Sequence, residues 1–107
     1  MFPKKNRADK KAVEEIFKKG SFLGFKNVNL KFIQKKELTS PQISFIVPKT
    51  VEKRAVRRNY LKRRGYIILK KYFKHIPNGF LGAFIFKKSI SSLEIENEIK
   101  NILNKIN

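Results

Sequence analysis

The chain has 107 residues, which suggests a single domain spanning residues 1–107, and its 41% of hydrophobic residues is too high for a disordered chain. It contains no cysteine and one histidine, so disulfides, thiolate catalysis and Cys-ligated zinc are excluded, and a Ser-His-Asp triad has little to draw on. Its 26 lysines and arginines against 8 acidic residues give a formal net charge of +18, which indicates a polyanionic partner, most commonly nucleic acid.

The positive charge has a second explanation, a lysine-rich organism with a basic proteome. The concentration of arginine at residues 54–64 favours a specific partner instead. No apolar run approaches the roughly 20 residues of a membrane span, and the basic start of the chain lacks the apolar segment of a signal peptide. We therefore expect a cytoplasmic protein with no membrane association.

The N-terminal part is predicted to hold a basic arm and a helix. Residues 1–8 are basic with an early proline, and we expect them to form a flexible arm. Asp9 is a suitable N-cap for apolar residues that recur at helical spacing up to Phe17, and Gly20 marks the helix end. Phe17 is either a core anchor or an aromatic platform on which an unpaired base stacks.

Three strands are predicted next. Ser21–Phe25 is a short candidate, and Asn27–Gln34 alternates apolar and polar residues as a half-buried strand does. Residues 35–41 form a polar connection. Gln42–Val47 is denser in apolar residues and is therefore expected to be central, with Pro48 ending its ladder.

The densest run of positive charge, Lys53–Lys74, also contains apolar residues at helical spacing. It is predicted to be a helix that a small domain holds rigid so that a basic face can dock on a polyanion. Thr50 is the expected N-cap, and Gly65 marks a kink or a close contact. The side chains expected to bind RNA are Arg54, Arg57, Arg58, Asn59, Lys62 and Arg63.

The chemistry of these residue types suits RNA. Arginine binds phosphate through two nitrogens and keeps its charge when desolvated. Asn59, between two stretches of basic residues, can bond a 2′-hydroxyl, a base edge or a metal-bound water. The alternative is a solvated charged face, above all for Arg57, Arg64 and Lys71, which fall within the apolar arc of the helix.

The C-terminal part continues with a turn-rich break at residues 75–79, a buried strand at Phe80–Phe86 and a helix capped by Ser91 or Ser92 with Glu94. The order is αβββαβα, which predicts an α+β sandwich with helices packed on one sheet. The basic helix then forms part of a β-α-β crossover.

Residues 44–64 resemble the bacterial ribonuclease P protein component, whose members carry a run of the form S-x-K-K-v-x-x-A-V-x-R-N-R-x-K-R after a strand. Residues 47–63 read VPKTVEKRAVRRNYLKR, and A-V-x-R-N-x-x-K-R is the specific part of the match. The likeness extends along most of the chain. Tyr60 stands where the family usually has the second arginine of R-N-R, and Pro48 and Thr50 replace the serine and second lysine of S-x-K-K.

The resemblance implies a protein subunit of the ribonucleoprotein endonuclease that removes the 5′ leader from precursor tRNA, with one protein per catalytic RNA. It implies that Mg²⁺ bound mainly by the RNA performs the hydrolysis and that the protein supplies no catalytic or metal-binding residue. It also implies a fold like that of domain 2 of ribosomal protein S5, with a left-handed β-α-β crossover against the usual right-handed rule.

The resemblance also implies roles for individual residues. The leader is expected to lie in a cleft between the basic helix and the sheet, lined by Phe17, with Lys49 at its edge. Val13 and Lys31 stand where the family often has further cleft aromatics. Matched by position in the motif, the expected RNA contacts are Arg58, Asn59, Lys62 and Arg63.

Other functions remain open on the residues alone. A ribosomal-protein-like or general RNA-binding chaperone domain would share the charge, but it would not require the A-V-x-R-N-x-x-K-R run. A DNA-binding helix-turn-helix would need a second helix after residues 75–79, where a strand is predicted. A self-contained nuclease would need paired acids for two metal ions, and Asp9 is the only aspartate.

Overall fold

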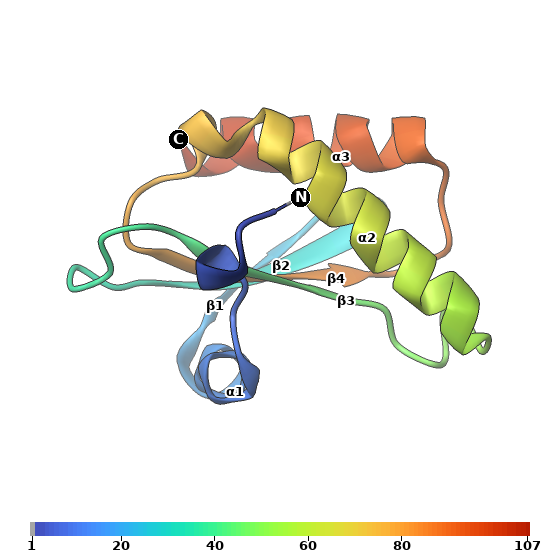
Figure 1. Ribbon diagram of the computed structural model, residues 1–107, viewed down its shortest axis with the longest axis horizontal. Coiled ribbons are helices and arrows are strands. Elements are labelled where there is room, and N and C mark those ends of the chain that lie inside the picture. The colour runs from blue at the N-terminus through green and yellow to red at the C-terminus, as the bar shows by residue number, and fades with distance from the viewer. Residues whose placement is uncertain (1) are drawn as a thin grey trace.

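The structure is a computed structural model that describes residues 2–107. A single four-stranded sheet has helix α1 on one face and helices α2 and α3 on the other (Figure 1). This arrangement confirms the predicted α+β sandwich and the order αβββαβα. The helices are α1 (Lys10–Lys19), α2 (Ala55–Lys71) and α3 (Ser92–Ile106), and the strands are β1 (Ser21–Gly24), β2 (Val28–Gln34), β3 (Gln42–Ile46) and β4 (Phe80–Phe86).

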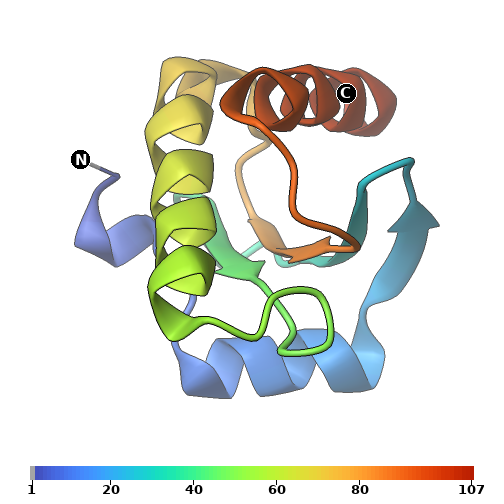
Figure 2. The ribbon, with the colours of Figure 1, turned by 90° about the vertical axis from the view of Figure 1, so that its right-hand side faces the viewer.

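The strand order is β1-β2-β4-β3, with β2 antiparallel to both of its neighbours and β3 parallel to β4. Helix α2 joins the two parallel strands. Viewed with α2 toward the reader and the strands pointing up, β4 lies to the left of β3, so the crossover is left-handed, as the family resemblance implied (Figures 1 and 2).

The expectation that residues 42–47 form a central strand is wrong, because β3 lies at the edge of the sheet. Its apolar residues are explained by burial on both faces rather than by a central position. Ile43 and Phe45 belong to the core beneath α2 and α3, and Ile46 packs against the smaller cluster beneath α1. Part of the open edge is covered by Arg7, which pairs with Ile43 as an isolated bridge.

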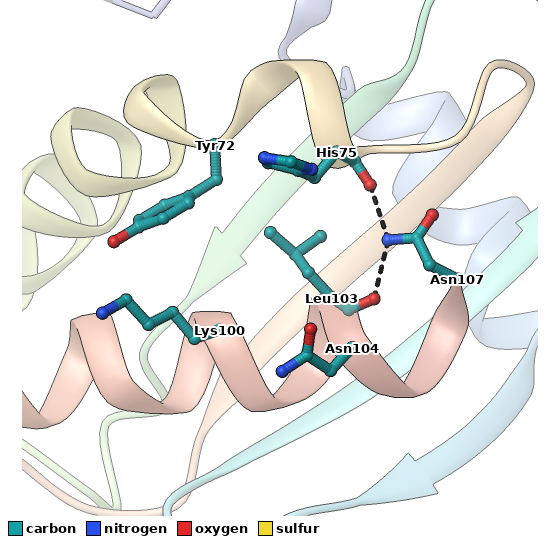
Figure 3. Close-up of a pocket in the computed structure, with 6 residues that line it drawn as sticks. All are labelled: Tyr72, His75, Lys100, Leu103, Asn104 and Asn107. Atoms are coloured by element: carbon teal, nitrogen blue, oxygen red, sulfur yellow. Dashed lines mark hydrogen bonds between the residues drawn. The ribbon is translucent and has the colours of Figure 1, made fainter.

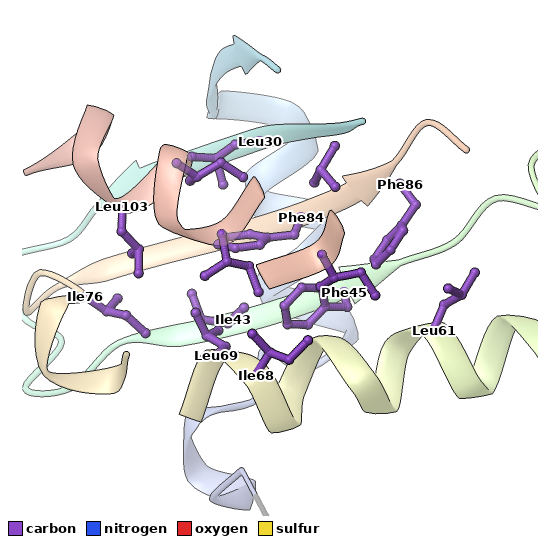
Figure 4. Packing of buried hydrophobic residues seen from close by; sticks show 14 of the residues in the cluster. Leu30, Ile43, Phe45, Leu61, Ile68, Leu69, Ile76, Phe84, Phe86 and Leu103 are labelled. Carbon is purple, nitrogen blue, oxygen red and sulfur yellow. The ribbon is translucent and has the colours of Figure 1, made fainter. Parts of the chain in front are cut away.

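The core consists of two apolar layers, one on each side of the sheet. Strand β4 serves both, because successive side chains point to opposite faces. Phe84 and Phe86 pack toward α2 and α3, while Leu81 and Ala83 pack toward Ile16 of α1. Figure 4 shows the larger layer, in which side chains of α2 lie directly against those of the sheet.

Local sequence signals account for the ends of two helices. The Asp9 carboxylate accepts a hydrogen bond from the Ala12 backbone nitrogen at 2.8 Å. Ser91 and Glu94 form a reciprocal capping box at 3.2 and 3.0 Å. The prediction of Thr50 as the cap of α2 is wrong, because residues 48–51 form a turn and the helix begins only after Arg54.

Gly65 is the point of closest approach between α2 and the sheet. A Cβ atom at this position would lie 2.8 Å from both Cδ1 and Cε1 of Phe45. That ring is buried and packs edge-on against Tyr66 and Phe84, at centroid distances of 4.9 and 5.0 Å. Of the two predicted roles for this glycine, the close contact is confirmed, since α2 runs without interruption from Ala55 to Lys71.

The expectation of a flexible arm over residues 1–8 is wrong for residues 2–8, the part that the structure describes. Phe2 is buried and packs against Tyr66, with ring centroids 5.3 Å apart. Asn6 is also buried, and its side-chain nitrogen donates to the Pro41 carbonyl at 2.6 Å. The Ala8 nitrogen donates to the Ile43 carbonyl at 2.8 Å. The segment is therefore fastened between the edge strand and α2.

Helix α3 is tied to the sheet by a buried carboxylate. Glu98 accepts hydrogen bonds from the backbone nitrogens of Asn27 at 2.6 Å and Val28 at 3.0 Å. Val28 is the first residue of β2, and Asn27 immediately precedes it. None of the helices within residues 2–107 is both long and apolar enough to cross a membrane.

Candidate nucleic-acid interface

Several acidic side chains bind partners within the fold. Glu15 pairs with Lys35 at 3.1 Å, and Glu96 pairs with Lys71 at 3.5 Å. Asp9 caps α1, Glu94 closes the capping box of α3, and Glu98 is buried against the backbone. The excess of positive charge is therefore little neutralised on the exposed side of α2.

The N-terminal end of α2 is held by an ion pair. The Arg54 guanidinium donates to both carboxylate oxygens of Glu52, at 3.2 and 3.0 Å, and the Arg54 backbone nitrogen donates to the same carboxylate at 3.1 Å. These hydrogen bonds lower the pKa of Glu52 to about 2 and raise the pKa of Arg54. Arg58 donates to the carbonyls of Glu52 and Lys53 at 3.0 and 2.6 Å. Arg54 and Arg58 thus fix the junction between loop and helix.

Three of the six residues predicted to bind RNA lie together on one side of α2. Asn59, Lys62 and Arg63 line a hollow of about 230 Å³ with Arg7 and Tyr66. The Arg7 guanidinium carbon lies 4.5 Å from the centroid of the Tyr66 ring. No salt bridge involves Arg7, Lys62 or Arg63 within residues 2–107. This side of the helix therefore presents cations and an amide to solvent.

Two more of the residues predicted to bind RNA lie together at the N-terminal end of α2. Arg54 and Arg57 line a second hollow of about 230 Å³ with Val56 and Tyr60. The structure therefore distributes the six predicted residues over two hollows and the loop junction, rather than over one continuous stripe.

Two further basic residues of α2 contact α3 instead of lying free. Arg64 donates from Nε to the Ser92 hydroxyl at 3.1 Å, and Lys71 pairs with Glu96. Their position within the apolar arc of the helix is explained by these contacts.

The residues predicted to contact the leader lie elsewhere. Phe17 is 43% exposed on α1, on the face of the sheet opposite to α2, and the Lys31 ammonium lies 5.2 Å from the centre of its ring. Lys49 is exposed in the loop after β3. The expectation of a cleft between α2 and the sheet is wrong, because core side chains such as Leu61 and Ile68 fill that space (Figure 4).

Arg7 and Tyr66 are interface candidates that sequence reasoning missed. Arg7 lies in the segment expected to be a flexible arm, and Tyr66 carries no charge. The only available signal was the spacing of Tyr66, four residues after Lys62 and seven after Asn59, which puts these three residues on one side of the helix. Their association depends on the pairing of the N-terminal segment with β3, a contact between distant parts of the chain.

A separate hollow of about 360 Å³ lies between the C-terminal ends of α2 and α3 (Figure 3). The Asn107 side-chain nitrogen bridges the carbonyls of His75 and Leu103, at 2.8 and 2.7 Å. This hollow lies at the opposite end of α2 from the residues predicted to bind RNA. Its lining consists of Tyr72, His75, Lys100, Leu103, Asn104 and Asn107.

Comparison with known proteins agrees with this architecture. The ribonuclease P protein of Staphylococcus aureus superposes with a TM-score of 0.82 at 24% identity, covering 94% of each chain. The ribonuclease P protein of Thermotoga maritima gives 0.80 at 24% identity, covering 94% of this chain and 97% of that one. A search of curated proteins found no match. A family model described as Ribonuclease P matches residues 2–107, and the chain therefore belongs to the ribonuclease P protein family.

Proposed function

We propose that α2 docks this protein on the ribonuclease P RNA, and that the complex removes the 5′ leader from precursor tRNA. Membership of the family makes the chain a protein subunit of ribonuclease P, which acts in tRNA processing with an RNA partner. The observation that supports the docking site is the group of Arg7, Lys62 and Arg63 with Asn59, in which no cation forms a salt bridge within residues 2–107 and whose hollow has no acidic lining residue. The alternative of a chaperone without a role in tRNA processing is not favoured by the family.

The proposed contacts follow from the chemistry of the hollow. Arg63 and Arg7 can each grip a phosphate with two nitrogens, Lys62 adds a mobile point charge, and Asn59 can bond a 2′-hydroxyl. Arg54 and Arg58 support these contacts indirectly, because their hydrogen bonds fix the start of the helix. Arg57 contributes positive charge from the neighbouring hollow. Because hydrogen bonds within the fold already order Arg54 and Arg58, less entropy is lost when this end of the helix binds RNA.

The leader is proposed to bind the other face of the sheet. Phe17 offers a half-exposed ring on which an unpaired base can stack, and Lys31, close above this ring, can hold a phosphate. Lys49 extends the positive charge from the loop after β3. Since Phe17 and α2 lie on opposite faces, one protein molecule can contact the catalytic RNA and the leader at the same time.

The hydrolytic chemistry is assigned to the RNA. Within residues 2–107, no three side chains of Asp, Glu, His or Cys come together in a group that could hold a metal ion. Magnesium ions bound by the RNA would supply the Lewis acid and the activated water. We propose one protein per RNA, acting in the cytoplasm.

Reconstitution tests this function. The protein and a bacterial ribonuclease P RNA are assayed separately and together on precursor tRNA at low Mg²⁺ concentration. We expect cleavage at the 5′ leader only in the mixture, because the protein screens repulsion between two polyanions. Metal-dependent cleavage by the protein alone, or no gain over the RNA alone, would contradict the proposal.

A further inference from the structure

Two apolar side chains on α2 are exposed in the middle of its basic region. Val56 is 83% exposed and Tyr60 is 40% exposed. They stand four residues apart, so they are neighbours on one side of the helix. Neither belongs to either core cluster. Isolated exposed apolar residues are common in proteins, but these two form a hollow together.

The hollow has an apolar wall and a basic rim. Val56 and Tyr60 line it with Arg54 and Arg57, and its volume is about 230 Å³. The Arg57 guanidinium carbon lies 5.0 Å from the centre of the Tyr60 ring, within the range of a cation–π contact. A flat aromatic ring and a guanidinium plane are therefore held against each other in the absence of RNA.

We propose that an unpaired nucleotide of the ribonuclease P RNA stacks its base on Tyr60 in this hollow and turns its phosphate toward Arg57. Aromatic rings and guanidinium planes are the two protein surfaces on which unstacked RNA bases pack. Both charged residues that line the hollow are arginines; Arg54 is paired with Glu52, whereas no salt bridge involves Arg57 within residues 2–107. Together with the net charge of +18, this favours a nucleotide over an apolar protein segment as the occupant. This inference rests on the proposed docking of α2 on RNA.

The proposal also gives a role to Tyr60, which stands where the family motif R-N-R usually has its second arginine. The second arginine of R-N-R would add a charged contact, whereas Tyr60 adds an uncharged flat ring. The two side chains predict different salt dependence. A stacking contact releases no counterion, while each phosphate contact adds about 0.7 to 0.9 to the slope of log affinity against log salt.

The test measures affinity for ribonuclease P RNA over a range of salt concentrations. Tyr60→Ala and Tyr60→Leu should each weaken binding by about 5- to 100-fold, the usual loss for one stacked base, with an unchanged salt slope. Tyr60→Phe keeps the ring and should bind like the wild type. Tyr60→Arg should steepen the slope by about one phosphate contact.

Phe22→Ala is the matched control, because Phe22 is a 56% exposed aromatic on β1, outside the hollow. It should leave affinity for the RNA unchanged. Tyr60→Ala within twofold of the wild type, or Tyr60→Leu equal to the wild type, would overturn the stacking proposal while leaving the docking of α2 intact. If the affinity of the wild-type protein for the RNA does not change with salt concentration, the proposed docking of the basic helix on RNA is contradicted instead.

Discussion

Glu98→Ala tests whether a single buried carboxylate holds α3 to the sheet. Glu98 is 5% exposed, and its Oε1 accepts the backbone N–H groups of Asn27 and Val28 at 2.6 and 3.0 Å. Alanine removes the acceptor and leaves these two buried donors without a partner. Because these donors lie at the start of β2, in its first residue and the residue before it, and β2 pairs with both β1 and β4, the loss affects the centre of the fold.

The expected loss in the free energy of unfolding follows from the number of buried N–H groups left without an acceptor. Each buried donor left unsatisfied costs about 1–3 kcal/mol, so the loss of two partners should lower the free energy of unfolding by about 2–6 kcal/mol. A protein of this size is stable by only about 5–15 kcal/mol in total. Glu98→Ala should therefore remove a large share of the stability.

Urea unfolding followed by circular dichroism measures this loss. Glu98→Gln is the matched control, because its amide oxygen can still accept, and it should lose less than half as much. Asn101→Ala, at an exposed position of the same helix, should change stability by less than about 0.5 kcal/mol. If Glu98→Ala also stays within that margin, the two hydrogen bonds do not stabilise the fold.

Three further predictions follow from other contacts. Gly65→Ala should lose about 1 kcal/mol in urea unfolding, because crowding against Phe45 outweighs the gain in helix propensity, and a stabilised variant would contradict this packing. The pKa of Glu52 is about 2 against an ordinary 4.5, so its pairing with Arg54 stabilises the fold above pH 4.5 and is lost as the pH falls toward 2. The melting temperature of Glu52→Gln should therefore lie below that of the wild type at pH 6 and match it near pH 2; equal values at pH 6 would refute the role of the pair. Phe17→Ala should weaken binding of precursor tRNA to the holoenzyme by about 1–3 kcal/mol and leave mature tRNA unaffected, and equal loss for both would exclude a leader contact.

The sequence predicted those elements whose signals are local. Asp9 and the Ser91–Glu94 pair mark helix starts because their side chains reach backbone nitrogens within three residues. The basic helix and the strand after it could be predicted from periodicity, and the β-α-β crossover followed from their order. The resemblance to the family supplied the handedness of the crossover, which periodicity does not carry.

Contacts between distant residues explain the failures. The apolar residues of β3 suggest a central strand, but an edge strand covered by helices on both faces is equally apolar. The sequence does not reveal that Phe2 and Asn6 are held in place, because their partners, Tyr66 and Pro41, are far along the chain. The resemblance implies a cleft beneath α2, but the sequence does not state how closely a helix packs on the sheet, and Leu61 and Ile68 fill that space.

The most direct test of the account compares two double variants that lose the same charge. Lys62→Ala/Arg63→Ala removes two cations from the exposed side of α2, and Lys100→Ala/Lys105→Ala removes two exposed cations from α3. If α2 docks on the ribonuclease P RNA, the first pair should flatten the salt dependence of binding by about 1.4 to 1.8 in slope, and the second should leave it unchanged. Equal losses for both pairs would show that net charge alone attracts the RNA, and that α2 is not the docking element.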